Sequence, residues 1–150
     1  MAVLNHTIVA AHDHKRSAAF VAEILGLPAP VSLGPFVVVQ ASEATSLDFV
    51  ETDGPVTSQH YAFLVTEAEF DEIFARIGDL DLPYWADPHQ HARGEINIWD
   101  GGRGVYFEDP NGHLLEIITR PYGSGGTTTA HPHPLAAATV EDSTPSNSEK

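Results

Sequence analysis

The chain has 150 residues, 42% of them hydrophobic, which is enough for one domain with a sizeable core. Twenty-one Asp and Glu residues against seven Lys and Arg give a formal net charge of −14, which disfavours binding to nucleic acid or to anionic lipid head groups. The absence of cysteine excludes disulfides, thiolate nucleophiles and cysteine-ligated zinc, so His, Asp and Glu are the strong metal ligands that remain.

The first residues of the chain predict a location and a strand. Residues 1–13 have neither a basic n-region nor a cleavage site of small residues. No run in the chain approaches the roughly 18 apolar residues that span a bilayer. We therefore expect a cytoplasmic protein without membrane contact. A strand is expected over residues 4–10, in which alternation places His6 and Ile8 on one face.

A helix and further strands follow. Asp13 is expected to cap a helix over residues 15–25, which carries an apolar stripe and ends at Gly26. Asp48 lies between two apolar residues in the middle of a later strand. The strands expected after the helix cover residues 36–40 and 46–51, with a shorter one around residues 31–33.

The same order of elements begins again at residue 59. A strand over residues 59–65 carries His60 near its start. Thr66 and Glu69 form a capping box for an amphipathic helix that is expected to end at Gly78. Beyond a loop over residues 82–94, strands are expected over residues 95–99, 104–108 and 113–119.

The last two strands are joined by the sequence Asp-Pro-Asn-Gly at residues 109–112, which is typical of a tight turn. In the strand after the turn, alternation places Leu115 and Ile117 on one face and Glu116 on the other, among apolar neighbours. An ionised carboxylate at such a position is costly to desolvate unless a cation, a metal or strong hydrogen-bond donors meet it. Glu116 is therefore a candidate site residue.

The two halves of the chain repeat one βαβββ unit. Each has a first strand with a histidine, a helix followed by glycine, and a last strand with a carboxylate in its middle. This predicts an α+β domain over residues 1–122, with module one at about 3–53 and module two at about 58–120. Residues 123–150 are rich in Gly, Ser, Thr, Pro and Ala, and we expect them to form a disordered tail.

Curved sheets with their helices outside would bring four potential metal ligands to the interior: His6, Asp48, His60 and Glu116. Two imidazoles and one carboxylate form a triad with open coordination positions, suited to Fe(II), Mn(II) or Zn(II). A second carboxylate would give a harder site for Ni(II), Mn(II) or Zn(II). A single strand histidine is more often a hydrogen-bonded core or surface residue, but recurrence at matching places in two repeats favours a metal. Asp48 has a shorter side chain, which leaves its role open.

Several segments carry a resemblance to a known superfamily: HTIV and HYAFLV in the first strands, LG at the end of a helix, and above all GVYFEDPNGHLLEI at residues 104–117. They resemble the vicinal oxygen chelate superfamily, which contains glyoxalases, bleomycin-resistance proteins, fosfomycin-resistance enzymes and extradiol dioxygenases. The resemblance covers about residues 4–120 and is specific for the fold rather than for one reaction. It implies two paired βαβββ modules that form an open eight-stranded barrel-like sheet with helices outside, a divalent metal ion and a homodimer.

The resemblance also implies roles for individual residues. His6 and His60 match the two first-strand histidines that bind the metal in this superfamily, and Glu116 matches the last-strand glutamate. Asp48 falls where glyoxalase I carries an additional glutamate, and aspartate at that place departs from the glyoxalase I pattern. Tyr106 lies ten residues before Glu116, as does an active-site tyrosine in extradiol dioxygenases.

Two further histidines are candidate general bases. His89 and His91 lie in the variable loop of the second module, where an imidazole can accept a proton near neutral pH. The alternative is that each is a solvated loop histidine. An aromatic pocket is a further hypothesis, with the alternative that the tryptophans belong to the core; the candidates for its lining are Trp85, Trp99, Phe36, Phe49 and Tyr106.

The leading functional hypothesis is a metal-dependent enzyme that acts on a small organic molecule through two adjacent oxygens. A dioxygenase-like reaction on an aromatic or polyketide-like substrate is favoured, because the triad leaves coordination positions open and few Lys or Arg residues are present to hold an anionic thiol cofactor. One alternative is a non-catalytic protein that sequesters an aromatic antibiotic, as bleomycin-resistance relatives do. Another is a glyoxalase-type lyase or isomerase, which would use the same ligands with a base.

Overall fold

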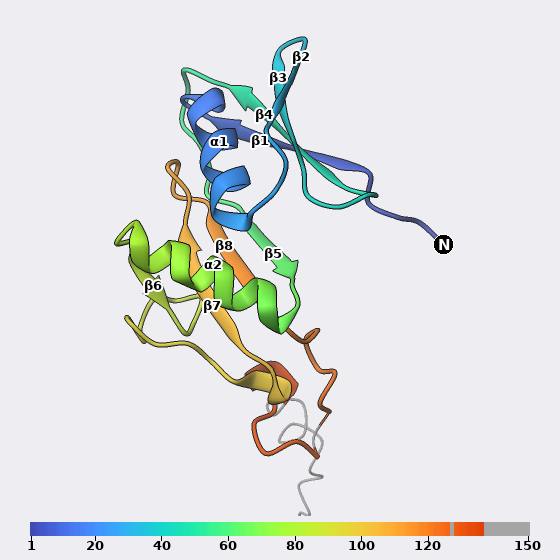
Figure 1. Cartoon of the computed structure of the whole chain (residues 1–150), viewed down its shortest axis with the longest axis vertical. Helices are drawn as coiled ribbons and strands as arrows, with labels where there is room; N and C mark the ends of the chain where they lie inside the picture. Colours follow the sequence, from blue (N-terminus) through green and yellow to red (C-terminus); the bar gives the residue numbers. More distant parts are fainter. Residues whose placement is uncertain (127, 137–150) are drawn as a thin grey trace, which may run out of the picture.

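A computed structural model describes residues 1–126 and 128–136, and it contains two βαβββ modules that follow one another along the long axis of the molecule (Figure 1). The first module comprises β1 (His6–Ala11), α1 (His14–Leu25), β2 (Val31–Leu33), β3 (Phe36–Gln40) and β4 (Ser46–Glu51). The second comprises β5 (His60–Leu64), α2 (Glu67–Asp79), β6 (Tyr84–Trp85), a 3-10 turn (Trp99–Gly101), β7 (Gly104–Glu108) and β8 (Leu114–Ile118).

Each module forms a four-stranded mixed sheet. The strand orders are β1-β4-β3-β2 and β5-β8-β7-β6, and in both sheets the first strand runs parallel to the last strand of its module. The predicted α+β class with two βαβββ modules is confirmed. The eight strands are divided between two separate sheets, and β1 and β5 each lie at a sheet edge. Among the described residues no helix is long and apolar enough to cross a membrane.

Alternating side chains decide which face of the first sheet is buried. Val9 and Ala11 of β1 are buried in the hydrophobic core with the apolar stripe of α1, as are Val37 and Phe49 of the neighbouring strands. The opposite face, which carries Ile8, is only partly buried. The sheet therefore has one face packed against the helix and one face left open.

Local sequence signals set the ends of α1 as expected. Asp13 caps the helix by accepting a hydrogen bond from the backbone N–H of Arg16 at 3.0 Å. Gly26 ends it in the left-handed conformation at φ 67°. A Cβ at Gly26 would lie 2.9 Å from Nη1 of Arg76 in α2, so glycine also permits close packing of the two modules there. Arg76 Nη1 donates to the Ile24 carbonyl at 3.2 Å, which joins the two helices.

The second helix confirms one prediction and corrects another. The capping box is present, with Thr66 and Glu69 bonding reciprocally to each other's backbone. The helix does not end at Gly78 as expected, but continues to Asp79. Gly78 is not among the residues with positive φ, whereas Asp81 is left-handed at φ 51° and turns the chain just beyond the helix.

The region between α2 and β7 also differs from the prediction. No strand forms over residues 95–99; there is only an isolated bridge between Asn97 and Gly104, followed by the 3-10 turn. The edge strand is instead β6, inside the segment that was expected to be a loop. The Asn97 side chain donates to the Ala86 carbonyl at 2.9 Å, and Asp100 takes a left-handed conformation at φ 59°. Both features stop residues 95–99 from continuing as a regular strand.

The predicted turn between β7 and β8 is confirmed and connects the modules. Asp109 organises it by accepting the backbone N–H groups of Asn111 and His113 at 2.9 and 2.8 Å, and Gly112 leaves the turn at φ 82°. The Asn111 side chain donates to Ser17 Oγ at 2.8 Å. The ring of His113 is buried and its Nε2 contacts the Ala10 carbonyl at 2.8 Å, so this histidine has a structural role.

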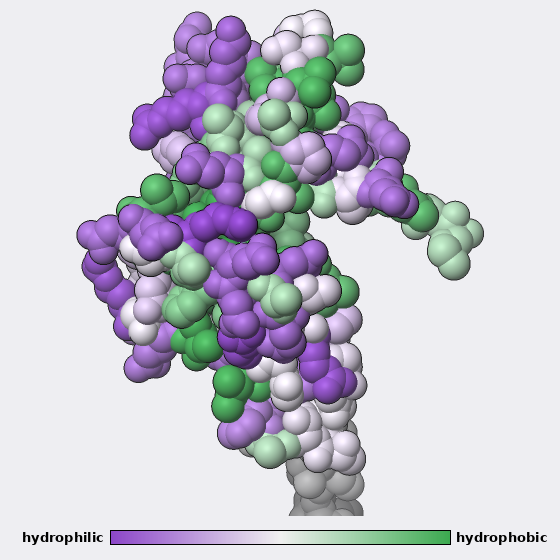
Figure 2. All heavy atoms as spheres, in the orientation of Figure 1, coloured by the Kyte–Doolittle hydropathy of each residue, from purple (hydrophilic) through white to green (hydrophobic). Residues whose placement is uncertain are grey.

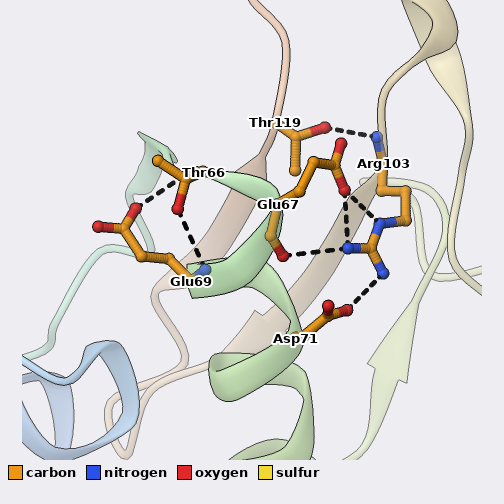
Figure 3. A network of polar contacts seen from close by, with 6 residues as sticks. All are labelled: Thr66, Glu67, Glu69, Asp71, Arg103 and Thr119. Carbon is orange, nitrogen blue, oxygen red and sulfur yellow. Dashed lines mark hydrogen bonds and ion pairs between the residues drawn. The ribbon is translucent and has the colours of Figure 1, made fainter.

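Arg103 fastens the start of β7 to α2 (Figure 3). Its guanidinium contacts Glu67 Oε2 and Asp71 Oδ1 at 2.7 and 2.8 Å, donates to the Glu67 carbonyl at 3.1 Å, and lies 4.3 Å from the centre of the Phe70 ring. Hydrogen bonds from Thr119 and Arg103 lower the pKa of Glu67. This network positions the segment that follows the Trp99 turn.

Replacing Arg103 by alanine is expected to destabilise the protein by about 1–2 kcal/mol, because it removes a multiply bonded guanidinium and its contact with an aromatic ring. Urea unfolding monitored by circular dichroism measures the change. Arg93→Ala is the matched control, since this exposed arginine makes no side-chain ion pair among the described residues, and a change within about 0.5 kcal/mol is expected. Equal effects of the two substitutions would contradict the prediction.

Candidate metal centre

His60 and Glu116 meet on neighbouring strands of the second sheet. They extend from β5 and β8, which pair in parallel with Ala62 opposite Glu116, so that His60 Nε2 lies 3.1 Å from Glu116 Oε2. The Glu116 side chain is fully buried, whereas the His60 side chain is 44% exposed. A buried carboxylate and a partly exposed imidazole therefore share one site.

The orientation of His60 is determined by its other nitrogen. Nδ1 lies 3.0 Å from the Leu114 carbonyl, and because a carbonyl only accepts, Nδ1 must be the donor. In the neutral ring the lone pair of Nε2 then faces the Glu116 carboxylate. Metal-binding histidines commonly donate their second N–H to a backbone carbonyl in this way. Two acceptors that face each other at this distance suit a proton or a metal cation, so the pair fits a divalent ion in its donor types and orientation.

Two tyrosines complete the surroundings of Glu116. The Tyr122 hydroxyl lies 2.6 Å from Oε1 and 2.5 Å from Oε2 of Glu116, and 2.8 Å from the hydroxyl of Tyr106. With Glu116 ionised, Tyr122 donates to the carboxylate and Tyr106 donates to Tyr122. Burial, followed by the bond with Tyr122 and the charge of Glu116, raises the pKa of Tyr106. Burial and the bond to Glu116 likewise raise that of Tyr122, so both phenols stay protonated at neutral pH.

The first module contains an equivalent pair. His6 begins β1 as His60 begins β5, and Asp48 lies opposite Ile8 in the register that places Glu116 opposite Ala62. His6 is exposed, its Nδ1 contacts the Asn5 side-chain oxygen at 2.8 Å, and its Nε2 has no hydrogen bond within residues 1–126 and 128–136. The Asp48 carboxylate accepts a hydrogen bond from Ser46 at 2.8 Å. The register thus supports the duplication inferred from the sequence.

The candidate residues do not all meet within one chain. The structure brings together His60, Glu116 and Tyr106, whose ring stacks on that of His60 at 5.8 Å. His6 and Asp48 belong to the open face of the other sheet, and no group of three or more potential metal ligands forms among residues 1–126 and 128–136.

The two loop histidines lie on the surface. The rings of His89 and His91 are 5.9 Å apart and both residues are exposed. His91 Nδ1 lies 3.7 Å from Asp87, whose pKa is lowered mainly by a hydrogen bond from the backbone of Ala92. No contact joins either histidine to the site around Glu116 in the described structure, so a role as general base stays a prediction.

The last two residues of the expected domain, 121 and 122, and the first part of the expected tail pack onto the site. We call residues 121–126 and 128–136 the C-terminal strap. Within it Tyr122 reaches Glu116, and His133, only 5% exposed, lies with its ring centre 4.1 Å from that of Tyr122 and 4.8 Å from that of Trp99. The sequence did not predict these contacts, because the segment is rich in Gly, Ser, Thr and Pro, which is typical of a disordered tail. The aromatic rings within the segment were the available signal that it packs against the domain. The rest of the expected tail lies outside the described residues.

A cleft of about 700 Å³ runs beside the exposed edge of β5. It is lined by His60 and apolar residues of β5 such as Phe63 and Leu64, and by Leu4 and Leu47 of the first module. The candidate centre therefore borders a mostly apolar space between the two modules.

Comparison with known proteins shows the family. The model of the glyoxalase/bleomycin resistance protein/dioxygenase superfamily matches residues 3–117. The chain is 28% identical over 120 residues to "Glutathione transferase FosA" of Serratia marcescens, with 76% of this chain and 78% of that protein covered.

Two solved structures are considerably more similar. "Oxidase ChaP-H1" is 60% identical, with a TM-score of 0.80, and the match covers 82% of this chain and 99% of that chain. "Oxidase ChaP-H2" is 61% identical, with a TM-score of 0.81, and the match covers 83% of this chain and 98% of that chain. The family match, spanning both modules and the His60–Glu116 pair, establishes that this chain belongs to the glyoxalase/bleomycin resistance protein/dioxygenase superfamily.

Proposed function

We propose that this protein is a divalent-metal-dependent oxygenase-type enzyme acting on a small, oxygenated, aromatic or polyketide-like substrate. The observation that carries the proposal is the contact of His60 Nε2 with the buried Glu116 carboxylate, in which the second nitrogen of His60 is held by the Leu114 carbonyl. Similarity at 60–61% identity to two proteins described as oxidases supports the oxygenase class over isomerisation.

A third ligand is proposed to come from a second copy of the chain. His6 is exposed and its Nε2 makes no hydrogen bond in the described part of the chain, and Ile8 on the same face is 55% exposed. On β5, Leu64 shares its face with His60 and is 61% exposed. β1 and β5 are edge strands, and both carry exposed apolar side chains. Exposed apolar residues and unpaired strand edges favour an interface with another chain.

Hydrophobic side chains also gather at the surface around the β2–β3 hairpin and along residues 1–5, which precede β1 (Figure 2). They include Val31 and Leu33, both about two thirds exposed. A homodimer in which the first sheet of one copy faces the second sheet of the other would cover this surface. It would also place His6 of one copy near His60 and Glu116 of its partner.

The chain's own residues then have distinct tasks. His60 and Glu116 would hold the cation, with Leu114 fixing the imidazole and burial excluding water from the carboxylate. When bound, a divalent cation supplies Lewis-acid or redox chemistry and a binding point for adjacent substrate oxygens. Tyr106 is stacked beside His60, but its hydroxyl donates to Tyr122 in the described position, so it would become available to a substrate oxygen only when Tyr122 moves away.

Elemental analysis of protein purified without a His tag and without added metal tests the proposal. Iron or manganese near one equivalent per chain supports the oxygenase class, whereas nickel or zinc would favour a glyoxalase-type isomerase. Failure to bind any metal, even after incubation with each ion, would contradict the enzyme proposal and favour a non-catalytic antibiotic-binding protein.

A further inference from the structure

The C-terminal strap blocks the carboxylate that the proposed metal requires. The Tyr122 oxygen lies almost equally far from both Glu116 oxygens, at 2.6 and 2.5 Å. This is the direction from which a cation approaches a bidentate carboxylate. His60 occupies the remaining approach to Oε2. A cation bound by both Glu116 oxygens therefore needs the place that the Tyr122 hydroxyl occupies.

Specific contacts hold the strap in this closed position. The Asp100 side chain, in a residue only 2% exposed, accepts the backbone N–H groups of Gly123 at 3.0 Å and Gly125 at 3.3 Å. The backbone N–H of Asp100 donates to the His131 carbonyl at 2.7 Å. A Cβ at Gly125 would lie 3.0 Å from Asp100 Cα, so the strap passes close to the turn. The left-handed conformation of Asp100 is a strain that these contacts help to maintain.

The closed position nevertheless leaves one buried polar atom unsatisfied. His133 Nδ1 accepts the backbone N–H of Leu135 at 3.1 Å, so Nε2 carries the proton in the neutral ring. Within the described residues Nε2 is buried without a hydrogen-bond partner. In the closed position this N–H group lacks the hydrogen bond that it would donate to water. When the strap opens, the group is solvated and the hydrogen bond is restored. Tyr122 is itself 45% exposed, which leaves it a path to solvent.

We propose that the C-terminal strap is an intramolecular competitor for the metal, in which the Tyr122 hydroxyl occupies Glu116 until a divalent cation displaces it and His133 moves away from Trp99. This inference rests on the proposed metal site. It assigns to Tyr122 a gating role, separate from the ligand roles of His60 and Glu116. Metal binding and strap opening are then one coupled equilibrium.

Removing the Tyr122 hydroxyl is expected to tighten metal binding. Titration of the full-length chain with Mn(II), with free ion followed by electron paramagnetic resonance, compares wild type with Tyr122→Phe. An affinity about tenfold higher or more is expected for the variant, because the cation no longer competes with a hydrogen bond to a charged carboxylate. Tyr84→Phe is the matched control; its ring packs against Phe74 in the second module, and its affinity should equal that of wild type.

Movement of the strap has its own signal. The chain has two tryptophans, so Trp85→Phe leaves Trp99, beside His133, as the single reporter. Zn(II), which does not quench fluorescence as paramagnetic ions do, is expected to change the Trp99 emission with the same midpoint as binding. A His133→Ala variant in this background should show the altered emission before zinc is added.

The outcomes separate the two proposals. Equal or weaker Mn(II) binding by Tyr122→Phe would mean that Tyr122 does not compete, and it would overturn the strap proposal while leaving the metal site intact. Zinc binding without a change in Trp99 emission would also overturn strap opening. Absence of metal binding in wild type and in Tyr122→Phe alike would overturn both proposals.

Discussion

Glu116→Gln and His60→Ala are each expected to lower the affinity for a divalent metal by at least about 100-fold, more than is typical for loss of a partner that only supports a ligand. Glutamine keeps the volume of the buried side chain and can still accept from Tyr122, but it lacks the charge that a cation needs. His60→Ala removes the imidazole whose Nε2 faces Glu116. Turnover should fall with metal occupancy. Mn(II) titration and elemental analysis measure the binding directly, independent of knowing the substrate.

Asp48→Asn is the matched control for Glu116→Gln, because both carboxylates occupy the same register position in their modules. We expect it to retain metal, since Asp48 is one methylene shorter and already accepts from Ser46. His12→Ala controls for loss of an exposed histidine. Metal loss in Asp48→Asn would make Asp48 a fourth ligand. Undiminished binding by Glu116→Gln in a folded protein would refute the proposed centre.

The second large effect concerns the origin of the third ligand. His6→Ala and Glu116→Gln should each bind little metal alone, whereas a mixture that has exchanged subunits should recover it. In a mixed dimer one site combines His6 of the Glu116→Gln chain with His60 and Glu116 of the His6→Ala chain. Statistical exchange gives half mixed dimers with one intact site each, so about a quarter of the wild-type metal content is expected.

The exchange is performed by unfolding the two variants together in urea and refolding them, with each variant refolded alone as the control. Light scattering after size-exclusion chromatography establishes the oligomeric state. No recovery from a mixture that demonstrably contains mixed dimers would place the site within one chain. A monomer that binds metal with wild-type affinity would contradict the shared site altogether.

Much of the fold follows from local patterns in the sequence. Alternation along β8 predicted that Glu116 lies on the other face of the strand from the core-facing Leu115 and Ile117. The turn predicted at residues 109–112 joins β7 and β8 as expected. Capping signals located the start of both helices, because a cap depends on side chains and backbone only a few residues apart. Repetition of the βαβββ order predicted the two modules before any contact between them was known.

Residue patterns were insufficient at the end of α2 and over residues 95–99. Gly78 is compatible with a helix end, but it remained helical while Asp81 made the turn. Residues 95–99 alternate like a strand, yet Asn97 bonds to Ala86 and the chain bends at Asp100. Over residues 95–99 the contact with Ala86 outweighs intrinsic strand preference, which differs by only about 1 kcal/mol per residue, whereas the end of α2 is set by local backbone bonds from Asp81 to Gly78 and from Leu82 to Ile77.

The candidate site divides in the same way. By itself the sequence determined which residue types are available for a metal and, through the repeat, that His60 and Glu116 occupy matching strands. Only the tertiary structure decided that these two meet within one chain while His6 lies on another sheet, and that Tyr122 covers Glu116. The reason is physical: strand period sets the face on which a side chain lies, whereas its partner depends on how sheets and chain ends pack.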